Sequence, residues 1–185
     1  MVSTEQFKNG LTFKLEGKVV RLIEFQHVKP GKGAAFVRTK LRIIKTGFVL
    51  ERTFDGGTKF EDAYIQEKEL QYLYKDGDTF YFMDQQTFEQ VELSSEEVKR
   101  AANYIIENMN ISASFCDGAL LEVSPPMFVE LVVTETEPGV RGDTAKGGTK
   151  SAKLESGAVV QVPLFVEKGD KIKVDTRTGT YVSRV

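Results

Sequence analysis

The sequence of 185 residues is poor in the side chains on which most catalytic and metal sites depend. Its one cysteine, Cys116, excludes a disulfide within the chain, and its one histidine, His27, has no second histidine with which to share a metal ion. No run of about 18 apolar residues exists to span a membrane, and the first ten residues lack the apolar core of a signal peptide. These shortages favour a protein of the reducing cytoplasm, with no metal, cofactor or membrane partner.

Catalytic patterns are equally scarce. Cys116 lies in "SASFCDGALL" and is expected to be a small buried residue. The segment 142–151, "GDTAKGGTKS", resembles a phosphate-binding loop, but Thr149 stands where the glycine before the lysine must be. The tripeptide Arg-Gly-Asp at 141–143 matches a cell-adhesion signal, but such a signal acts only on a secreted protein, and the sequence shows no signal peptide. We therefore expect that the protein is not an enzyme.

Charge is unevenly distributed, although the net charge is only −2. Residues 1–64 hold 12 bases and 7 acids, residues 65–127 hold 4 bases and 12 acids, and residues 128–185 hold 9 bases and 8 acids. Six bases and no acid fall between residues 25 and 50. Such a segment is typical of a surface that contacts nucleic-acid phosphates, although charge also varies along any chain by chance.

Short runs of β-type residues between glycine, aspartate and asparagine predict an all-β fold of small barrels. The predicted strands are "LTFKLEG", "KVVRLIEFQHV", "AAFVRTKLRII", "GFVLERTF", "TFYFMD", "FEQVEL", "MFVELVVTETE", "AVVQVPLFV" and "DKIKVDTRTGTYVSRV". One short helix is predicted after the capping box of Ser94 and Glu97. Its apolar stripe, expected to close the end of a barrel, consists of Val98, Ala101, Ala102 and Ile105.

Two features suggest where the chain divides. Pro125-Pro126 is a plausible boundary and residues 64–67 are a vaguer one, so the predicted domains are 1–64, 65–127 and 128–185. The segments "DGDTFYFMD" and "KGDKIKVD" share a Gly-Asp turn followed by alternating apolar residues. Two related barrels explain this similarity, and so does chance, because Gly-Asp turns before strands are common.

The stretch "HVKPGKGAAFVRTKLR", residues 27–42, presents Lys32 between two glycines directly after a proline. Pro30 fixes one backbone angle, and Gly31 and Gly33 permit turns that other side chains forbid. Since the flanking sequence is strand-like, residues 29–33 are predicted to form the tip of a hairpin. A plain hairpin with a solvated lysine is the alternative to a functional tip.

The strand after this tip is predicted to carry a basic wall. Side chains alternate across a strand, so Arg38, Lys40 and Arg42 share one face. The opposite face, expected to pack inward, carries Val37, Thr39, Leu41 and Ile43. Together with Lys29, the basic wall predicts salt-sensitive contacts with an RNA backbone that do not read sequence.

Two distant motifs resemble the bacterial elongation factor P family. "FQHVKPGKGAAFVRTKLR" is the first, and "KSAKLESGAVVQVPLFVEKG", residues 150–169, resembles the signature of the family's last domain. The matching positions of the second motif are Lys150, Ala152, Gly157, Val160, Val162, Pro163, Val166 and Gly169. The resemblance covers the whole chain and implies three barrels in an L shape, an SH3-like (KOW-type) barrel followed by two OB-folds.

The resemblance also implies a function in translation. Members of the family bind the 70S ribosome between the peptidyl-tRNA (P) and exit (E) sites and promote peptide bond formation at consecutive prolines. Lys32 corresponds to the tip residue that reaches toward the acceptor end of the P-site peptidyl-tRNA. Ribosomal RNA, this tRNA and the mRNA in the E site are the expected partners of a monomeric, cytoplasmic factor.

Further roles follow from the resemblance alone. In many members the tip lysine is modified, so a Lys32-modifying enzyme is an expected partner, whereas the modification itself is left open. Gly142, Asp143 and Thr144 match a loop near the E-site codon, with an ordinary turn as the alternative. Tyr181 and Arg184 correspond to positions near the anticodon stem of the tRNA. The acidic middle domain either faces basic ribosomal protein or is acidic to prevent misplaced RNA binding.

Two other functions compete with this interpretation. A generic single-stranded RNA-binding protein built from OB-folds would need aromatic stacking platforms, whereas Phe80 and Phe82 are expected in a core. An enzyme with Lys32 as its nucleophile would need a desolvated amine, and a hairpin tip between glycines is too exposed to provide one.

Overall fold

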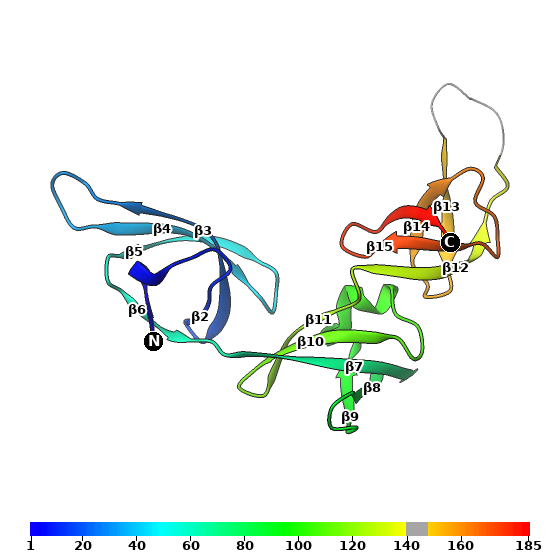
Figure 1. Cartoon of the computed structure of the whole chain (residues 1–185), viewed down its shortest axis with the longest axis horizontal. Coiled ribbons are helices and arrows are strands. Elements are labelled where there is room, and N and C mark those ends of the chain that lie inside the picture. Colours follow the sequence, from blue (N-terminus) through cyan, green and yellow to red (C-terminus); the bar gives the residue numbers. More distant parts are fainter. Residues whose placement is uncertain (140–147) are drawn as a thin grey trace. The chain divides into compact units, whose positions relative to one another are not determined.

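The structure, a computed structural model, describes residues 1–139 and 148–185 and is almost entirely β-structure (Figure 1). The prediction of an all-β fold with a short helix is confirmed. The chain divides into two compact units, residues 1–67 with 114–122 and residues 68–113 with 123–185. The three predicted domain ranges and their L-shaped arrangement stay predictions. No helix in the described part of the chain is long and apolar enough to cross a membrane.

The first sheet has the strand order β1-β6-β2-β3-β4-β5. Its elements are β1 Val2–Ser3, the short 3-10 helix η1 Thr4–Gln6, β2 Thr12–Leu15, β3 Lys18–Val28, β4 Phe36–Ile43, β5 Val49–Asp55 and β6 Lys59–Asp62. The rings of Phe7, Phe13 and Phe60 contact one another in its core, with centroids 4.7 to 5.9 Å apart. Val20, Leu22, Val37 and Leu41 complete this core from the two longest strands, so the core fixes the roots of β3 and β4.

The second sheet has the order β11-β10-β7-β8-β9. Its strands are β7 Ile65–Asp76, β8 Thr79–Asp84, β9 Gln90–Ser94, β10 Asn110–Cys116 and β11 Ala119–Ser124. The predicted helix follows β9 as α1 Ser95–Val98 and continues as the 3-10 helix η2 Lys99–Asn103. The capping box is confirmed, because Glu97 N donates to Ser94 Oγ at 3.3 Å and Ser94 N donates to Glu97 Oε2 at 2.9 Å.

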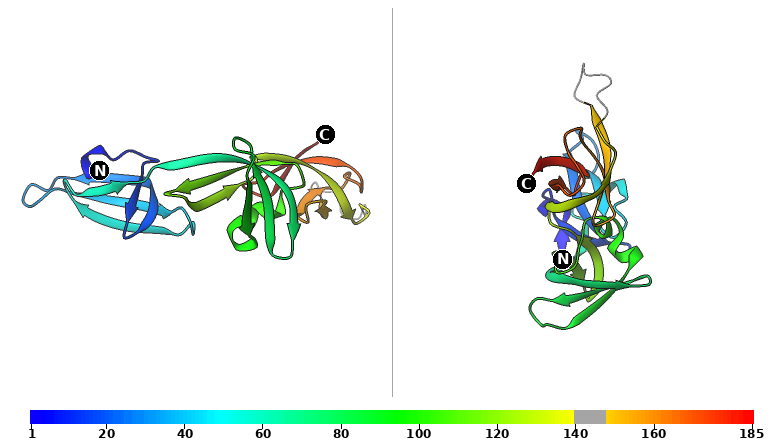
Figure 2. Two further views of the ribbon diagram at one scale, coloured as in Figure 1. Left: turned by 90° about the horizontal axis from the view of Figure 1, so that it is seen from below. Right: turned by 90° about the vertical axis from the view of Figure 1, so that its right-hand side faces the viewer.

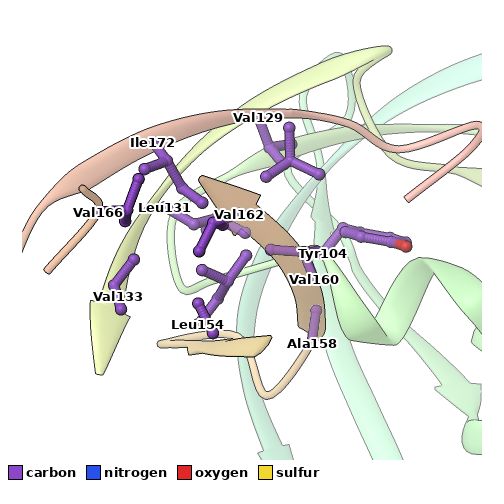
Figure 3. Close-up of a cluster of buried hydrophobic side chains, with 12 residues drawn as sticks. Tyr104, Val129, Leu131, Val133, Leu154, Ala158, Val160, Val162, Val166 and Ile172 are labelled. Carbon is purple, nitrogen blue, oxygen red and sulfur yellow. The ribbon is translucent and has the colours of Figure 1, made fainter. Parts of the chain in front are cut away.

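The third sheet has the order β14-β13-β12-β15-β16. Its strands are β12 Phe128–Thr136, β13 Thr149–Leu154, β14 Val159–Pro163, β15 Lys171–Asp175 and β16 Thr180–Arg184. Figure 3 shows its buried aliphatic core, which Tyr104 enters from the end of η2. The Ser156 hydroxyl, between β13 and β14, also donates to the Asn103 carbonyl at 2.6 Å, so the end of η2 is attached to this sheet.

The strand predictions were correct where the alternation of apolar residues is strong. Residues 18–28 and 79–84 are strands with the predicted bounds. The run 170–185 was wrong as one strand: Asp175 ends β15, its side chain accepts the N–H of Arg177 at 2.9 Å, and Gly179 closes a turn with φ of +70°. The unpredicted strands are β1, which has only two residues, and β6, β7, β10, β11 and β13, in which charged or small residues dilute the apolar pattern.

Candidate functional site

The Lys32 loop connects the two strands with the longest shared ladder of the first unit. β3 and β4 pair from Val20 and Ile43 at the root to Val28 and Phe36 at the end. Figures 1 and 2 show this hairpin extending beyond the rest of the first unit, with the loop at its end. The loop covers residues 29–35, two more than predicted, and every residue in it is exposed. Lys32 is therefore presented at the end of the arm that β3 and β4 form.

A third strand supports the base of the loop. β5 pairs with β4 as far as Asp55 opposite Phe36, and the next residue, Gly56, donates its N–H to the Ala35 carbonyl at 2.8 Å. A Cβ on Gly56 would lie 3.1 Å from that carbonyl oxygen, so a side chain at this position would press on the loop. The base of the loop is thus held by β5 as well as by the β3–β4 ladder, while the tip stays exposed.

The two glycines beside Lys32 do different things. Gly33 has φ of +119°, a conformation that residues with a side chain rarely adopt. Space is not the reason for glycine, because a Cβ on Gly33 would make only an ordinary contact of 3.7 Å with Pro30 Cγ. Gly31 is not in the positive-φ region, and a Cβ there would have no atom within 4 Å. Of the two glycines expected to permit such a turn, Gly33 therefore uses this backbone freedom and Gly31 does not.

The predicted alternation along β4 is confirmed. Val37, Thr39, Leu41 and Ile43 are buried, and the Thr39 hydroxyl is satisfied by donating to the Arg52 carbonyl at 2.8 Å. On the other face Arg38 and Arg42 are exposed and Lys40 is half-buried. The Arg38 guanidinium lies 5.6 Å from the centroid of the Phe36 ring, which directs this cation along the arm toward the loop.

Strand pairing changes the electrostatics of this face. Lys40 stands opposite Glu24 on β3 and Glu51 on β5. These two glutamates directly precede and follow residues 25–50, which hold no acid in the sequence, and the fold brings both of them beside Lys40. Arg42 stands opposite Arg21, which is exposed and was not among the predicted contacts. The basic wall is therefore a mixed face, with cations concentrated at its two ends.

The pairing of Lys40 with Glu24 arises from an irregularity that the sequence does not reveal. The register of β3 and β4 shifts between Leu22 and Glu24, so that Ile23 is extra and the inside-outside alternation of β3 reverses there. An open groove of about 480 Å³ crosses β3, β4 and β5 at this level. Its charged lining residues are Glu24, Arg38, Lys40, Glu51 and Arg52.

The remaining candidate residues lie elsewhere. Cys116 is buried as expected, and burial raises the pKa of its thiol, so it is not a reactive nucleophile. His27 is exposed and contacts the Phe25 ring edge at a centroid distance of 5.5 Å. In residues 1–139 and 148–185 no three His, Cys, Asp or Glu side chains are grouped to hold a metal ion. The codon-loop residues Gly142, Asp143 and Thr144 lie outside the described residues.

Four further residues singled out in the sequence lie in the second and third sheets or at their edges. Phe80 and Phe82 are buried in the core, which confirms the expectation for both. Arg184 is exposed, with its guanidinium 5.7 Å from the Phe165 ring and 3.7 Å from an Asp170 carboxylate oxygen. Tyr181 is half-buried against the third-sheet core.

Comparison with known proteins identifies every part of the chain. Family models match residues 3–60 as the KOW-like domain of elongation factor P, residues 65–123 as its OB domain, and residues 129–184 as its C-terminal domain. Elongation factor P of Caldanaerobacter subterraneus subsp. tengcongensis is 55% identical over 185 residues, and that of Moorella thermoacetica is 54% identical over 184 residues. In both cases the match covers 100% of each chain.

Solved structures of lower similarity share the fold. A eukaryotic translation initiation factor 5A from Methanococcus jannaschii superposes with a TM-score of 0.57 at 22% identity, over 67% of this chain and 91% of that one. A translation initiation factor eIF-5A family protein from Naegleria fowleri gives 0.53 at 18% identity, over 66% and 96%. The predicted order of a KOW-type barrel followed by OB-folds is confirmed.

Proposed function

The chain belongs to the elongation factor P family and is a translation elongation factor, and we propose that it binds the 70S ribosome between the P and E sites to stimulate peptide bond formation at consecutive prolines. One observation supports the proposed mechanism above others. Lys32 is exposed in the loop at the end of the β3–β4 arm, and the bond from Gly56 to Ala35 fastens the base of that loop. Such an arm suits the task of carrying one cation to a distant target.

In this mechanism the protein positions and the ribosome catalyses. Proline reacts slowly because its ring restricts the backbone geometry of the reacting groups. A Lys32 ammonium beside the acceptor-end phosphates of the P-site tRNA would hold that end in a reactive pose. Orientation of reactants is worth up to roughly 7–11 kcal/mol in ideal systems, and on the order of a few kcal/mol would restore a stalled rate. No nucleophile or general base from this chain is required.

The basic residues beside the loop supply the proposed contacts with RNA backbone. Lys29 and Arg38 are exposed close to the tip, and Arg42 is exposed at the root of the arm with Arg21 beside it. We add Arg21 to the predicted contacts for that reason. Lys40 stays a predicted contact, but the glutamates on both sides lower its expected share of the salt-dependent binding.

Residues of the last predicted domain, 128–185, would complete the contacts with the mRNA and the tRNA. Gly142, Asp143 and Thr144 are proposed to meet the mRNA in the E site, and Tyr181 and Arg184 to lie near the anticodon stem. The factor would act as a cytoplasmic monomer, without cofactor or metal.

A modifying enzyme is proposed to lengthen Lys32, because added length carries hydrogen-bonding groups further from the hairpin. Pro30 stiffens the tip, so a small extension would suffice. Comparison of modified and unmodified protein, with and without Pro30→Ala, tests this step. We expect the variant to depend more on modification, and equal dependence would remove the argument. Intact mass of protein purified from its native cells should show an added mass that peptide mapping places on Lys32.

The central experiment is reconstituted translation of a template with three consecutive proline codons. Lys32→Ala should remove the stimulation that the wild-type protein provides. Lys18→Ala is the matched control, since Lys18 is an exposed lysine at the opposite end of the same strand β3 and should leave the stimulation intact. Equal activity of Lys32→Ala and wild type at subsaturating factor would contradict the proposal.

A further inference from the structure

The outward face of β7, β8 and β9 carries an aromatic pair within an acidic surround. β7 and β8 place Tyr74 opposite Tyr81, and β8 and β9 place Tyr81 opposite Glu92, so these three side chains form one row across three strands. The neighbouring rows supply the rest of the face: Asp76, Thr79 and Ser94 on one side, and Gln71, Met83 and Gln90 on the other. No basic residue stands at these nine positions.

A bulge produces this face. The register of β7 and β8 shifts between Tyr72 and Tyr74, so these two residues point to opposite sides of the sheet although they are two positions apart. Tyr72 is buried against Phe82, whereas 44% of the Tyr74 surface is exposed. Tyr74 is therefore placed on the outer face of the sheet by the bulge, and packing of the core does not account for an aromatic residue at this position.

The two tyrosine rings stack, with centroids 4.6 Å apart and planes 18° from parallel. One face of the Tyr81 ring is therefore covered by Tyr74, and the other is turned toward β9, where Glu92 is exposed. Burial raises the pKa of Tyr81, and the charge of Glu92 contributes next, which agrees with a carboxylate close to that ring. The row thus offers aromatic surface and negative charge within the reach of one side chain.

We propose that Tyr74, Tyr81 and Glu92 form a docking site for an arginine-bearing basic segment of a partner protein. A guanidinium is planar, so it stacks on an aromatic face while its N–H groups donate to a carboxylate in the same contact. Lysine makes the charge interaction but not the stacked, two-point contact. The preference of the site should therefore be for arginine over lysine.

Charge decides between a protein and an RNA partner for this face. Exposed tyrosines also stack on nucleic-acid bases, but such sites combine stacking with a positive groove for the backbone. Here the flanking charges are Asp76 and Glu92, and residues 65–127 hold 12 acids against 4 bases. Lys75, the nearest base on β7, lies on the other side of the sheet, 4.9 Å from the centroid of the buried Phe80 ring. Phosphates would be repelled, whereas a basic peptide is attracted.

The test is a titration of isotopically labelled full-length protein, followed by NMR of its tyrosine rings and backbone amides. The probes are the peptides GRGRGRGR and GKGKGKGK, blocked at both ends, and an eight-nucleotide oligocytidylate. Glu92→Gln and Tyr74→Leu remove the two parts of the site, both at exposed side chains. Glu122→Gln is the control for loss of one exposed carboxylate elsewhere in the same sheet.

The arginine peptide should shift the resonances of residues 74, 81 and 92 and bind more tightly than the lysine peptide. Each site variant should weaken its binding by about two- to fivefold, and Glu122→Gln should not. Shifts spread over all acidic residues, no difference between Glu92→Gln and Glu122→Gln, or stronger shifts of the tyrosines by the oligonucleotide would overturn the proposal. The ribosome and Lys32 take no part in this test, so its failure leaves the proposed function intact.

Discussion

The unequal roles of the two loop glycines lead to a prediction that separates tip conformation from tip chemistry. Gly33→Ala and Gly31→Ala each add one methyl group beside Lys32 and change no charge. Only Gly33 has a positive φ, and at +119° it lies outside the small left-handed region that other residues tolerate. A side chain at such a position costs about 1–3 kcal/mol, whereas the methyl at Gly31 would enter open space.

This cost should appear as a change in population rather than as global unfolding. The loop is exposed and outside the core, so the strained residue can relax by rearranging the tip while the barrel stays folded. At about 1.4 kcal/mol per tenfold change, 1–3 kcal/mol reduces the population of the native tip by about 5- to 150-fold. Stimulation at subsaturating factor should fall by a similar ratio for Gly33→Ala and stay near the wild-type value for Gly31→Ala.

The assay is the three-proline template with both variants at the same modification state, which intact mass establishes beforehand. Urea unfolding of each variant checks that the barrel is unchanged. If both variants stimulate like wild type, the tip conformation does not matter for function. If both lose activity to the same extent, crowding by a methyl group matters and the backbone conformation does not, which also refutes the reasoning.

Three further predictions concern charge, the core and pH. Arg42→Gln should lower the slope of log Kd against log salt for 70S binding by roughly 0.7–0.9, whereas Lys40→Gln, between two glutamates, should change it less; equal slopes would contradict the mixed-face argument. Leu131→Ala, at a fully buried position, should lower the free energy of unfolding in urea by about 2–5 kcal/mol, with exposed Val182→Ala as the near-neutral control. Backbone N–H donors and a lysine hold the pKa of buried Asp84 below its ordinary 3.8, so Asp84→Asn should cost stability above about pH 5. The difference from wild type should shrink as the pH falls below about 4, and a difference that grows in acid would reverse the sign of the argument.

Much of the candidate site was predictable because it depends on local chemistry. Proline and glycine around Lys32 have fixed backbone preferences, and alternation along a strand follows from its geometry, so the exposed tip and the buried face of β4 were both expected. The capping box before α1 is a signal within four residues and was equally readable. Which of the two glycines has the positive φ was not predictable, since a glycine permits that conformation without adopting it everywhere.

The features that sequence reasoning missed depend on which strands become neighbours. The pairing of Lys40 with Glu24 needs the bulge at Ile23, and the exposure of Tyr74 needs the bulge beside Tyr72. Tyr104 lies between Ala102 and Ile105 of the predicted helical stripe, yet it packs into the core of the third sheet. Each placement results from contacts between residues far apart in the chain, for which a single sequence carries no local signal.

The sequence by itself determined the β-type elements with strong alternation, the glycine-flanked lysine at a turn and the motifs of a translation factor. These depend on backbone preferences and periodicity that act over a few neighbouring residues. Tertiary structure alone decided the register, and with it which charges face one another on the arm and which tyrosines stack on the second sheet. The physical reason is that a one-residue shift in pairing exchanges the two faces of a strand without altering any local preference of the chain.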